Sequence, residues 1–244
     1  MIGLLTSNFA FYHDVVNELK KRDLPFISLS FTEKIPPNVD VVITSERERE
    51  RIDFGNVVIW KSGESIENLV DKALIYSSGE DVKIVFGIDP GDNIGIAIFG
   101  NRKLIRSLIA SSPEQAANFI KEYVEDIGAK EVVVKIGNGA RLIRNRIINR
   151  LIKENIRMEI VDEAAIPCVD DDEVAASTIA LAEGREIKDT LSVEPKEGEI
   201  REMQRLSRIK SRNITISKEL ARKVLRGEMK LEDAIEIQRG KNQA

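Results

Sequence analysis

Ile84-Val85-Phe86-Gly87-Ile88-Asp89-Pro90-Gly91 is the most informative stretch of the chain, and Asp92-Asn93-Ile94-Gly95-Ile96-Ala97-Ile98-Phe99 follows it directly. The apolar, β-branched run before Asp89 predicts a buried strand, and the second run predicts another. Asp89 would end the first strand, where Pro90 and Gly91 form a tight turn. Because burying an unpaired carboxylate is costly, a metal ion or a phosphate-bearing ligand would explain an acid there. Asp-Pro-Gly is also ordinary turn chemistry, so an Asp that only begins a turn is the alternative.

The motif Gly87-Ile88-Asp89-Pro90-Gly91, with Gly95-Ile96-Ala97, resembles the first strand and hairpin of the RNase H-like superfamily. It is most similar to the branch that contains RuvC-type Holliday junction resolvases and YqgF-type nucleases. The downstream pattern predicts, in order, a strand over 103–110, a helix opened by Ser112-Pro113, a strand over 131–136, a helix over about 141–154, a strand over 157–161 and a helix over about 172–183. This βββαβαβα order is the RNase H-like order and fits residues 82 to about 187.

An actin-like phosphotransferase is an alternative to the RNase H-like interpretation, because that fold also opens with an Asp-x-Gly turn. That fold needs two such subdomains and a second phosphate loop. Only about 100 residues follow Asp89 before the chain changes character near residue 190, so the sequence disfavours it.

The resemblance implies a metal-dependent nuclease that hydrolyses phosphodiester bonds in structured nucleic acid, with Mg²⁺ or Mn²⁺ held by carboxylates. Asp89 matches the first ligand of the family. Asp172 matches the ligand on the last helix, because both relatives place an Asp before an Ala-rich helix and Ala175-Ala176 follows here. Asp170 and Asp171 would then be capping or outer residues. The alternative is that this acidic cluster only caps the helix and complements its dipole.

The resemblance implies Glu163 as the better candidate for the third carboxylate, because YqgF-like proteins have Asp-Glu-Arg after the fifth strand and Asp162-Glu163 occurs at that position. Asp162 is the second choice, and Ala164 replaces the Arg. Lys135 stands where RuvC-like enzymes have an acid, and it could contact a phosphate or neutralise Asp89 and displace a metal. These departures leave a second hypothesis, a catalytically inactive RNase H-like module for nucleic-acid binding or assembly.

Further candidate nucleic-acid contacts follow the strand over 131–136. The loop Gly137-Asn138-Gly139 precedes a helix, so its backbone amides could bind an anion, with Asn138, Arg141 and Arg144 adding contacts to phosphate. A solvated helix face is the alternative for these arginines.

The carboxyl-terminal tail is locally basic although the whole chain is acidic. Residues 201–226 carry nine basic side chains against two acids, and Arg205, Arg208 and Arg212 are candidate phosphate contacts. Ser217 is the expected N-cap of a helix over 218–226 that ends at Gly227, and a second helix is expected over 231–238. The apolar side of these helices could instead pack on a partner or on another part of the chain.

Residues 1–80 predict a separate small α/β unit, with strands over 2–6, 25–30, 39–44 and 56–60 and helices over 9–22 and 65–77. This alternation favours a flavodoxin-like parallel sheet. Thr6-Ser7-Asn8 lies where such folds bind phosphate, but a helix N-cap is the favoured interpretation. The alternating charges of residues 46–51 predict a solvated surface segment. The expected domains are thus 1–80, an RNase H-like mixed-sheet domain over 81–190 and a basic helical tail over 191–244.

The amino-acid composition excludes several classes of protein and of catalytic site. The net charge of −4 over 244 residues does not announce a nucleic-acid binder, although a local basic face would suffice. Cys168 and His13 are the single cysteine and histidine, which excludes disulfides, cysteine-built zinc sites and a Ser-His-Asp triad in the second domain. No run approaches the roughly 18 apolar residues of a membrane span. We therefore expect a cytoplasmic protein that does not associate with a membrane. Its expected partner is nucleic acid, DNA or RNA. A homodimer is compatible with the sequence, and the 32% of charged residues, with many isoleucines, favours a thermophile.

Overall fold

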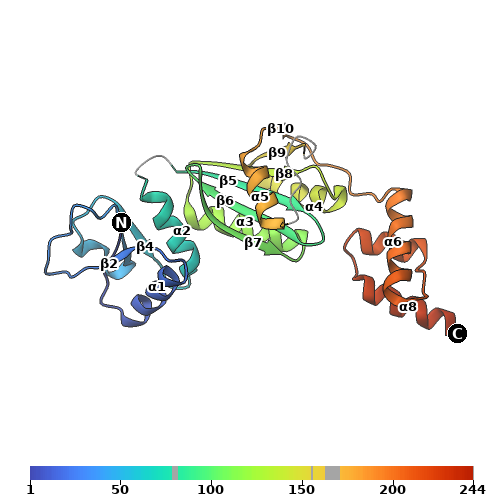
Figure 1. Cartoon of the computed structure of the whole chain (residues 1–244), viewed down its shortest axis with the longest axis horizontal. Helices are drawn as coiled ribbons and strands as arrows, with labels where there is room; N and C mark the ends of the chain where they lie inside the picture. The colour runs from blue at the N-terminus through green and yellow to red at the C-terminus, as the bar shows by residue number, and fades with distance from the viewer. Residues whose placement is uncertain (79–81, 155, 163–170, 244) are drawn as a thin grey trace.

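A computed structural model of the chain describes residues 1–78, 82–154, 156–162 and 171–243. They form an N-terminal four-stranded sheet, a central six-stranded sheet and a C-terminal group of helices, which follow one another along the long axis of the molecule (Figure 1). The expected class, a parallel-sheet α/β unit followed by a mixed sheet and a helical tail, is confirmed. No helix in these ranges is long and apolar enough to cross a membrane.

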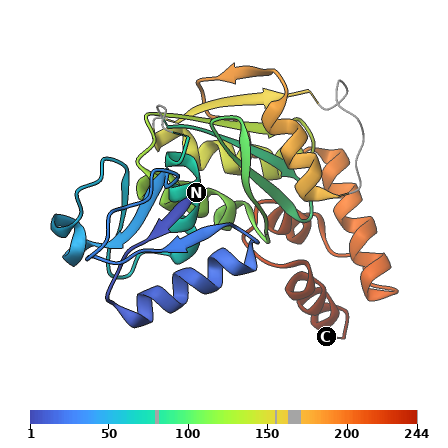
Figure 2. The ribbon, with the colours of Figure 1, turned by 60° about the vertical axis from the view of Figure 1, so that its left-hand side comes forward.

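The N-terminal unit is built from alternating strands and helices, as its sequence predicts. Its elements are β1 (Ile2–Leu4), α1 (Phe9–Lys21), β2 (Phe26–Ser28), β3 (Val41–Ser45), β4 (Val57–Trp60) and α2 (Ile66–Tyr76). The strands are parallel in the order β2-β1-β3-β4, which is the beginning of the flavodoxin-like order. Figure 2 shows α1, in blue, running along one side of this sheet. Val41 and Ile43 of β3 pack into the larger apolar cluster with α1 and α2, and Val42 packs into a smaller cluster.

Residues 46–51 form a 3-10 helix, η1 (Glu46–Arg51), and the prediction of a solvated segment is wrong at Glu48. Glu48 is buried, and its carboxylate accepts hydrogen bonds from the hydroxyls of Thr6, Ser7 and Ser45 and from the backbone N–H of Ser7. Asn8 caps α1 by accepting from the Phe11 backbone N–H, as expected. The polar residues after β1 therefore hold an internal carboxylate at the edge of the sheet where flavodoxin-like folds place ligands.

Glu48 links the segment before α1 to the end of β3, because its buried carboxylate accepts hydrogen bonds from both. Burial opposes ionisation of this carboxyl, but the hydrogen bonds from Ser45, Ser7 and Thr6 outweigh it and lower the pKa to about 2. A carboxyl whose folded-state pKa lies below its unfolded value contributes stability above the unfolded pKa, and this is lost as pH falls through the folded pKa.

We predict that Glu48→Gln lowers the free energy of unfolding at pH 7 and that this deficit shrinks as pH falls from about 4.5 towards about 2. Urea unfolding of both proteins at pH 7, 4 and 2.5 measures it. A deficit that is the same at all three values would show that the charge of Glu48 has no role.

The central unit contains β5 (Lys83–Pro90), β6 (Ile94–Gly100), β7 (Lys103–Ala110), α3 (Pro113–Ile127), β8 (Glu131–Gly137), α4 (Arg141–Leu151), η2 (Ile152–Glu154), β9 (Arg157–Val161), α5 (Asp172–Leu181) and β10 (Gly184–Ile187). The sheet order is β10-β9-β8-β5-β6-β7. β5, β6 and β7 are antiparallel neighbours, whereas β8 and β9 run parallel to β5. The expected βββαβαβα order is confirmed, and β10 is an addition that the sequence did not predict.

Alternate residues of the central strands face two different helical layers. Ile84, Phe86 and Ile88 of β5 pack with α3 and α4 in the main core. The opposite face carries only a small cluster, in which Ala97 and Phe99 meet Ala176 and Ala180 of α5. One short helix thus covers this second face (Figure 1).

A buried carboxylate joins the N-terminal unit to the central unit. Asp71 of α2 is fully buried, with Oδ1 2.5 Å from Nη1 of Arg22 and Oδ2 3.1 Å from Nη2 of Arg106 on β7. Burial raises the pKa of Asp71, and the two guanidinium groups oppose this shift. The Arg106 Nη2 also donates to Asn68, whose amide donates to Asp126 of α3 at 2.6 Å. Because an unpaired buried charge is costly, this network fixes α2 against β7 and α3.

The C-terminal unit consists of α6 (Glu197–Ser211), α7 (Lys218–Leu225) and α8 (Leu231–Gln243), with its own apolar cluster centred on Ile200, Ile216 and Leu220. Ser217 caps α7, and Gly227 follows its end with a φ of 74°, as expected. Backbone bonds from Gly227 to Val224 and from Glu228 to Lys223 form a Schellman motif. α6 had no predicted counterpart, and α8 extends beyond the predicted residue 238.

Candidate functional site

Two glycines allow α5 to lie directly on the central sheet. A Cβ atom added to Gly87 would lie 1.9 Å from the backbone oxygen of Ala176, and one added to Gly95 would lie 2.0 Å from that of Asp172. Neither distance is compatible with a real side chain, so only glycine permits this approach. The helix backbone therefore crosses β5 and β6 with its first turn over Gly95.

Asp89 and Asp172 are brought together by this packing. Asp89 is the direct cross-strand partner of Gly95, so its side chain shares the face on which α5 lies. The Cβ of Asp172 is 3.2 Å from the Cβ position of Gly95, and opposed Cβ atoms in antiparallel strands are about 5 Å apart. The Cβ atoms of the two acids therefore lie within about 9 Å of each other, a separation that two carboxylates can close around one cation.

The amino end of α5 is capped by a residue other than Asp172. Asp171 is the N-cap residue, and its Oδ1 accepts from the backbone N–H groups of Glu173 at 2.9 Å and Val174 at 3.0 Å. Asp172 is the first helical residue, and Glu173 accepts a hydrogen bond from Ser107 of β7. Asp171 is thus a capping residue, as expected, and Asp170, for which the same role was expected, lies outside the described residues.

The remaining acids of the predicted set are Glu163 and its alternative, Asp162. Glu163 lies outside the described residues. Asp162 is exposed just after β9, which is separated from β5 by β8. Within the described ranges, no group of three or more His, Cys, Asp or Glu side chains is arranged to hold a metal ion. Two carboxylates nevertheless suit Mg²⁺, which proteins often hold through one or two carboxylates together with water and substrate phosphate.

Lys135 is directed away from the amino end of α5. Its register partners on the neighbouring strands are Gly87 and Glu159, so its side chain lies on the face of the sheet that α5 covers. The amine donates to the backbone oxygen of Ala182 at 2.5 Å and lies 4.0 Å from Oε2 of Glu159. Ala182 ends the helix that Asp172 begins. The side chain thus satisfies the carboxyl end of α5 and pairs with a buried glutamate.

The loop after β8 lies beside the end of β5, since Ile88 and Ile136 are register partners. Asn138 is exposed in this loop, and both its backbone oxygen and its side-chain oxygen accept from Nη1 of Arg144. Arg144 therefore braces the predicted anion-binding loop from the first turn of α4.

Arg141 uses its guanidinium group to hold the C-terminal unit. It donates to both carboxylate oxygens of Glu199 at 2.9 and 2.8 Å and to the backbone oxygens of Ser192 and Glu194. The hydrogen bond from Arg141 lowers the pKa of Glu199, and the same bond raises the pKa of Arg141. Asn145 and Asn149 add bonds to residues 191–192. Side chains along α4, from Arg141 to Asn149, thus hold residues 191–194 and the first turn of α6.

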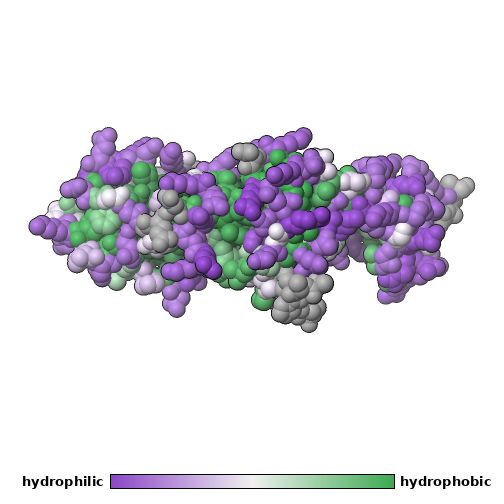
Figure 3. All heavy atoms as spheres, turned by 90° about the horizontal axis from the view of Figure 1, so that it is seen from above, coloured by the Kyte–Doolittle hydropathy of each residue, from purple (hydrophilic) through white to green (hydrophobic). Residues whose placement is uncertain are grey.

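Of the predicted tail arginines, Arg205 and Arg208 lie on α6, and Arg212 is its C-cap residue with a left-handed φ of 68°. Residues 201, 205 and 208 follow at intervals of four and three, so they form a stripe about 10 Å long on one face of α6, and Arg212 follows at the end of the helix. Arg205 pairs with Glu202, whereas no salt bridge within the described residues involves Arg208 or Arg212. Arg201, which sequence reasoning did not select, extends this stripe, and its spacing was the available signal. Hydrophilic residues dominate this end of the molecule (Figure 3).

Two segments match known domain families. Residues 1–76 match the family of response regulator receiver-like domains, and residues 196–241 match a family of three-helical-bundle domains. No curated protein matches the chain.

The chain is distantly similar to several solved structures. An Argonaute from Marinitoga piezophila in complex with 5′ OH guide RNA is 12% identical over 66% of this chain, with a TM-score of 0.26. The same Argonaute with guide RNA and target DNA gives a TM-score of 0.27 at 12% identity and the same coverage. The chain spans 39% of the length of each Argonaute chain. A Ppx/GppA family member from Aquifex aeolicus is 10% identical, with 93% of this chain and 73% of that chain covered and a TM-score of 0.16.

We predict that Gly95→Ala destabilises the protein by about 1–3 kcal/mol or more, because α5 must lift from the sheet to admit the methyl group. Gly55→Ala is the control, since a Cβ there meets nothing within 4 Å and the change should stay within about 0.5 kcal/mol. Thermal unfolding with hydrogen exchange on residues 172–181 measures both effects. Equal stability of the two variants would contradict the close packing of α5.

Proposed function

We propose that the protein binds structured nucleic acid and hydrolyses its phosphodiester bonds with Mg²⁺ or Mn²⁺, as RuvC- and YqgF-like nucleases do. Asp89 and Asp172 would hold the ion, and Glu163 would complete the set. The observation that carries this proposal is the seating of Asp172 on Gly95, directly across the strand pair from Asp89. Two acidic residues on elements far apart in sequence then lie near each other at the end of a sheet.

The surroundings of this point suit a phosphate. The amino terminus of α5 contributes the positive end of its dipole, which favours an anion. The loop containing Asn138 lies beside the end of β5 and is held by Arg144. A hard divalent cation at the carboxylates would supply Lewis-acid stabilisation of the phosphate and would activate water. Lys135 does not oppose this arrangement, because its amine is committed at the other end of α5.

The α6 stripe would supply affinity. Arg201, Arg208 and Arg212 are exposed and have no salt bridge within the described part of the chain. Exposed arginines spaced along a helix can follow a phosphate backbone and release its counterions. Arg141 is not part of this surface, since Glu199 and two backbone oxygens occupy its donors.

The second candidate is a nucleic-acid-binding module without catalysis. It is favoured by the absence, among the described residues, of three metal-ligating side chains in one group. Both candidates share the α6 surface and differ only in the chemistry at Asp89 and Asp172.

We predict that the wild-type protein cleaves branched DNA or RNA in Mg²⁺ or Mn²⁺ and not in EDTA, and that Asp89→Asn or Asp172→Asn abolishes cleavage. The exposed Asp92 belongs to the same turn, so Asp92→Asn is a matched control that should retain activity. Gel assays on branched and linear DNA and RNA, with binding measured in parallel, separate the candidates. Binding without cleavage on every substrate would support the inactive module and overturn the nuclease.

We predict that replacing Arg201, Arg208 and Arg212 together with Gln weakens nucleic-acid binding and reduces the log–log salt slope by about two to three units, because each lost phosphate contact removes about 0.7–0.9. The control replaces Lys218, Lys223 and Arg226 with Gln, which removes the same charge from side chains that already pair with Glu197, Glu219 and Glu194. Fluorescence anisotropy from 50 to 300 mM salt gives both slopes. Similar slopes for the two triple variants would assign the effect to net charge alone.

A further inference from the structure

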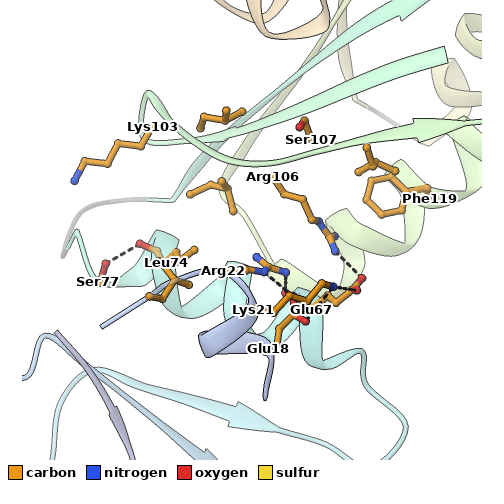
Figure 4. Close-up of a pocket in the computed structure, with 14 residues that line it drawn as sticks. Glu18, Lys21, Arg22, Glu67, Leu74, Ser77, Lys103, Arg106, Ser107 and Phe119 are labelled. Carbon is orange, nitrogen blue, oxygen red and sulfur yellow. Dashed lines mark hydrogen bonds and ion pairs between the residues drawn. The ribbon is translucent and has the colours of Figure 1, made fainter. Parts of the chain in front are cut away.

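A groove runs along the outer edge of the central sheet, between β7 and the N-terminal unit. It encloses about 800 Å³ and is lined on one side by residues 103–108 of β7. Leu24 and Leu74 lie on the opposite wall, with Glu18, Lys21 and Glu67 among its polar residues. Figure 4 shows β7 passing above α1 and α2, with Lys103 at one end of the opening and Arg106 directed towards Glu67.

The β7 strand is the last in the sheet order, so one side of its backbone has no neighbouring strand. Among the described residues, no backbone hydrogen bond joins β7 to any segment other than β6. An edge of this kind presents a row of N–H and C=O groups that can pair with another extended chain. The N-terminal unit flanks this edge, and the groove lies between the two.

We propose that this groove binds an extended, acidic and apolar peptide segment of a partner protein, which adds as a seventh strand beside β7. Backbone bonding along β7 would give affinity, and the walls would select side chains. Leu24 and Leu74 of the N-terminal unit and Leu104 and Leu108 of β7 line the groove and would contact the apolar side chains of the peptide.

The charges of the groove favour an acidic partner. Arg22 and Arg106 are committed to Asp71, and Lys21 lies 3.4 Å from Glu18 and 3.6 Å from Glu67. Lys103 is exposed and forms no salt bridge within the described residues. It is therefore the cation that remains for a partner's carboxylate. The commitment of both arginines disfavours a small anionic molecule, which would need their donors.

The test uses a fluorescent eight-residue peptide that alternates Glu and Val and the full-length protein. We expect saturable binding in anisotropy, with new hydrogen-exchange protection confined to 103–108. The same peptide with alternate backbone nitrogens methylated on its pairing edge should bind at least about tenfold more weakly, since it loses several backbone hydrogen bonds. A Lys–Val peptide of equal length should also bind more weakly.

Leu104→Ser and Ile109→Ser form a matched pair, because both side chains are half exposed on β7, at 53% and 50%, and only Leu104 lines the groove. Leu104→Ser should weaken binding about fivefold and Lys103→Glu by about two- to fivefold, whereas Ile109→Ser should leave it unchanged. Equal binding of the methylated peptide, or an equal loss in Ile109→Ser, would overturn strand addition in the groove. A concentration-dependent dimer that Leu104→Ser abolishes would show that the edge pairs with a second copy instead.

Discussion

The close approach of α5 to the central sheet is the constraint on which the functional face depends. Gly87 and Gly95 leave no room for a side chain between the strands and the helix backbone. A single short helix can therefore cover this face with the small residues Ala176 and Ala180, while the main core forms on the other side. The position of the first turn of α5 follows, and with it the position of Asp172 relative to Asp89.

Buried or bidentate ion pairs connect the three units around this face. Asp71 of the N-terminal unit pairs with Arg106 of the central unit and with Arg22 of its own unit, and Glu199 of the C-terminal unit pairs with Arg141 of the central unit. These contacts use arginines that would otherwise be candidates for phosphate binding. Arg208, Arg212 and Lys103 are exposed and form no salt bridge within the described residues, and Lys103 lies on β7 whereas the two arginines belong to the C-terminal unit. The proposed nucleic-acid surface is therefore separate from the proposed peptide groove.

The sequence was sufficient where the signal is local. Apolar runs located every strand of the described residues except β10, Ser217 and Gly227 bounded α7, and the resemblance carried by the β5–β6 hairpin indicated the βββαβαβα order of elements along the central unit. It failed where a side chain finds its partner across the fold. The alternating charges of residues 46–51 gave no sign that Glu48 would turn inward to Thr6 and Ser7, because those donors lie about 40 residues earlier. Periodicity likewise could not show that Arg141 would bind Glu199 or that Lys135 would reach Ala182.

The central claim is that Asp89 and Asp172 together bind a divalent cation, and Mn²⁺ binding measured by electron paramagnetic resonance tests it most directly. The matched control is Asp171→Asn, because Asn caps a helix as well as Asp does and α5 should stay intact. We expect Asp89→Asn and Asp172→Asn each to remove the tightest Mn²⁺ site of the wild-type protein, while Asp171→Asn keeps it. Unchanged Mn²⁺ binding in both Asp89→Asn and Asp172→Asn would contradict the account.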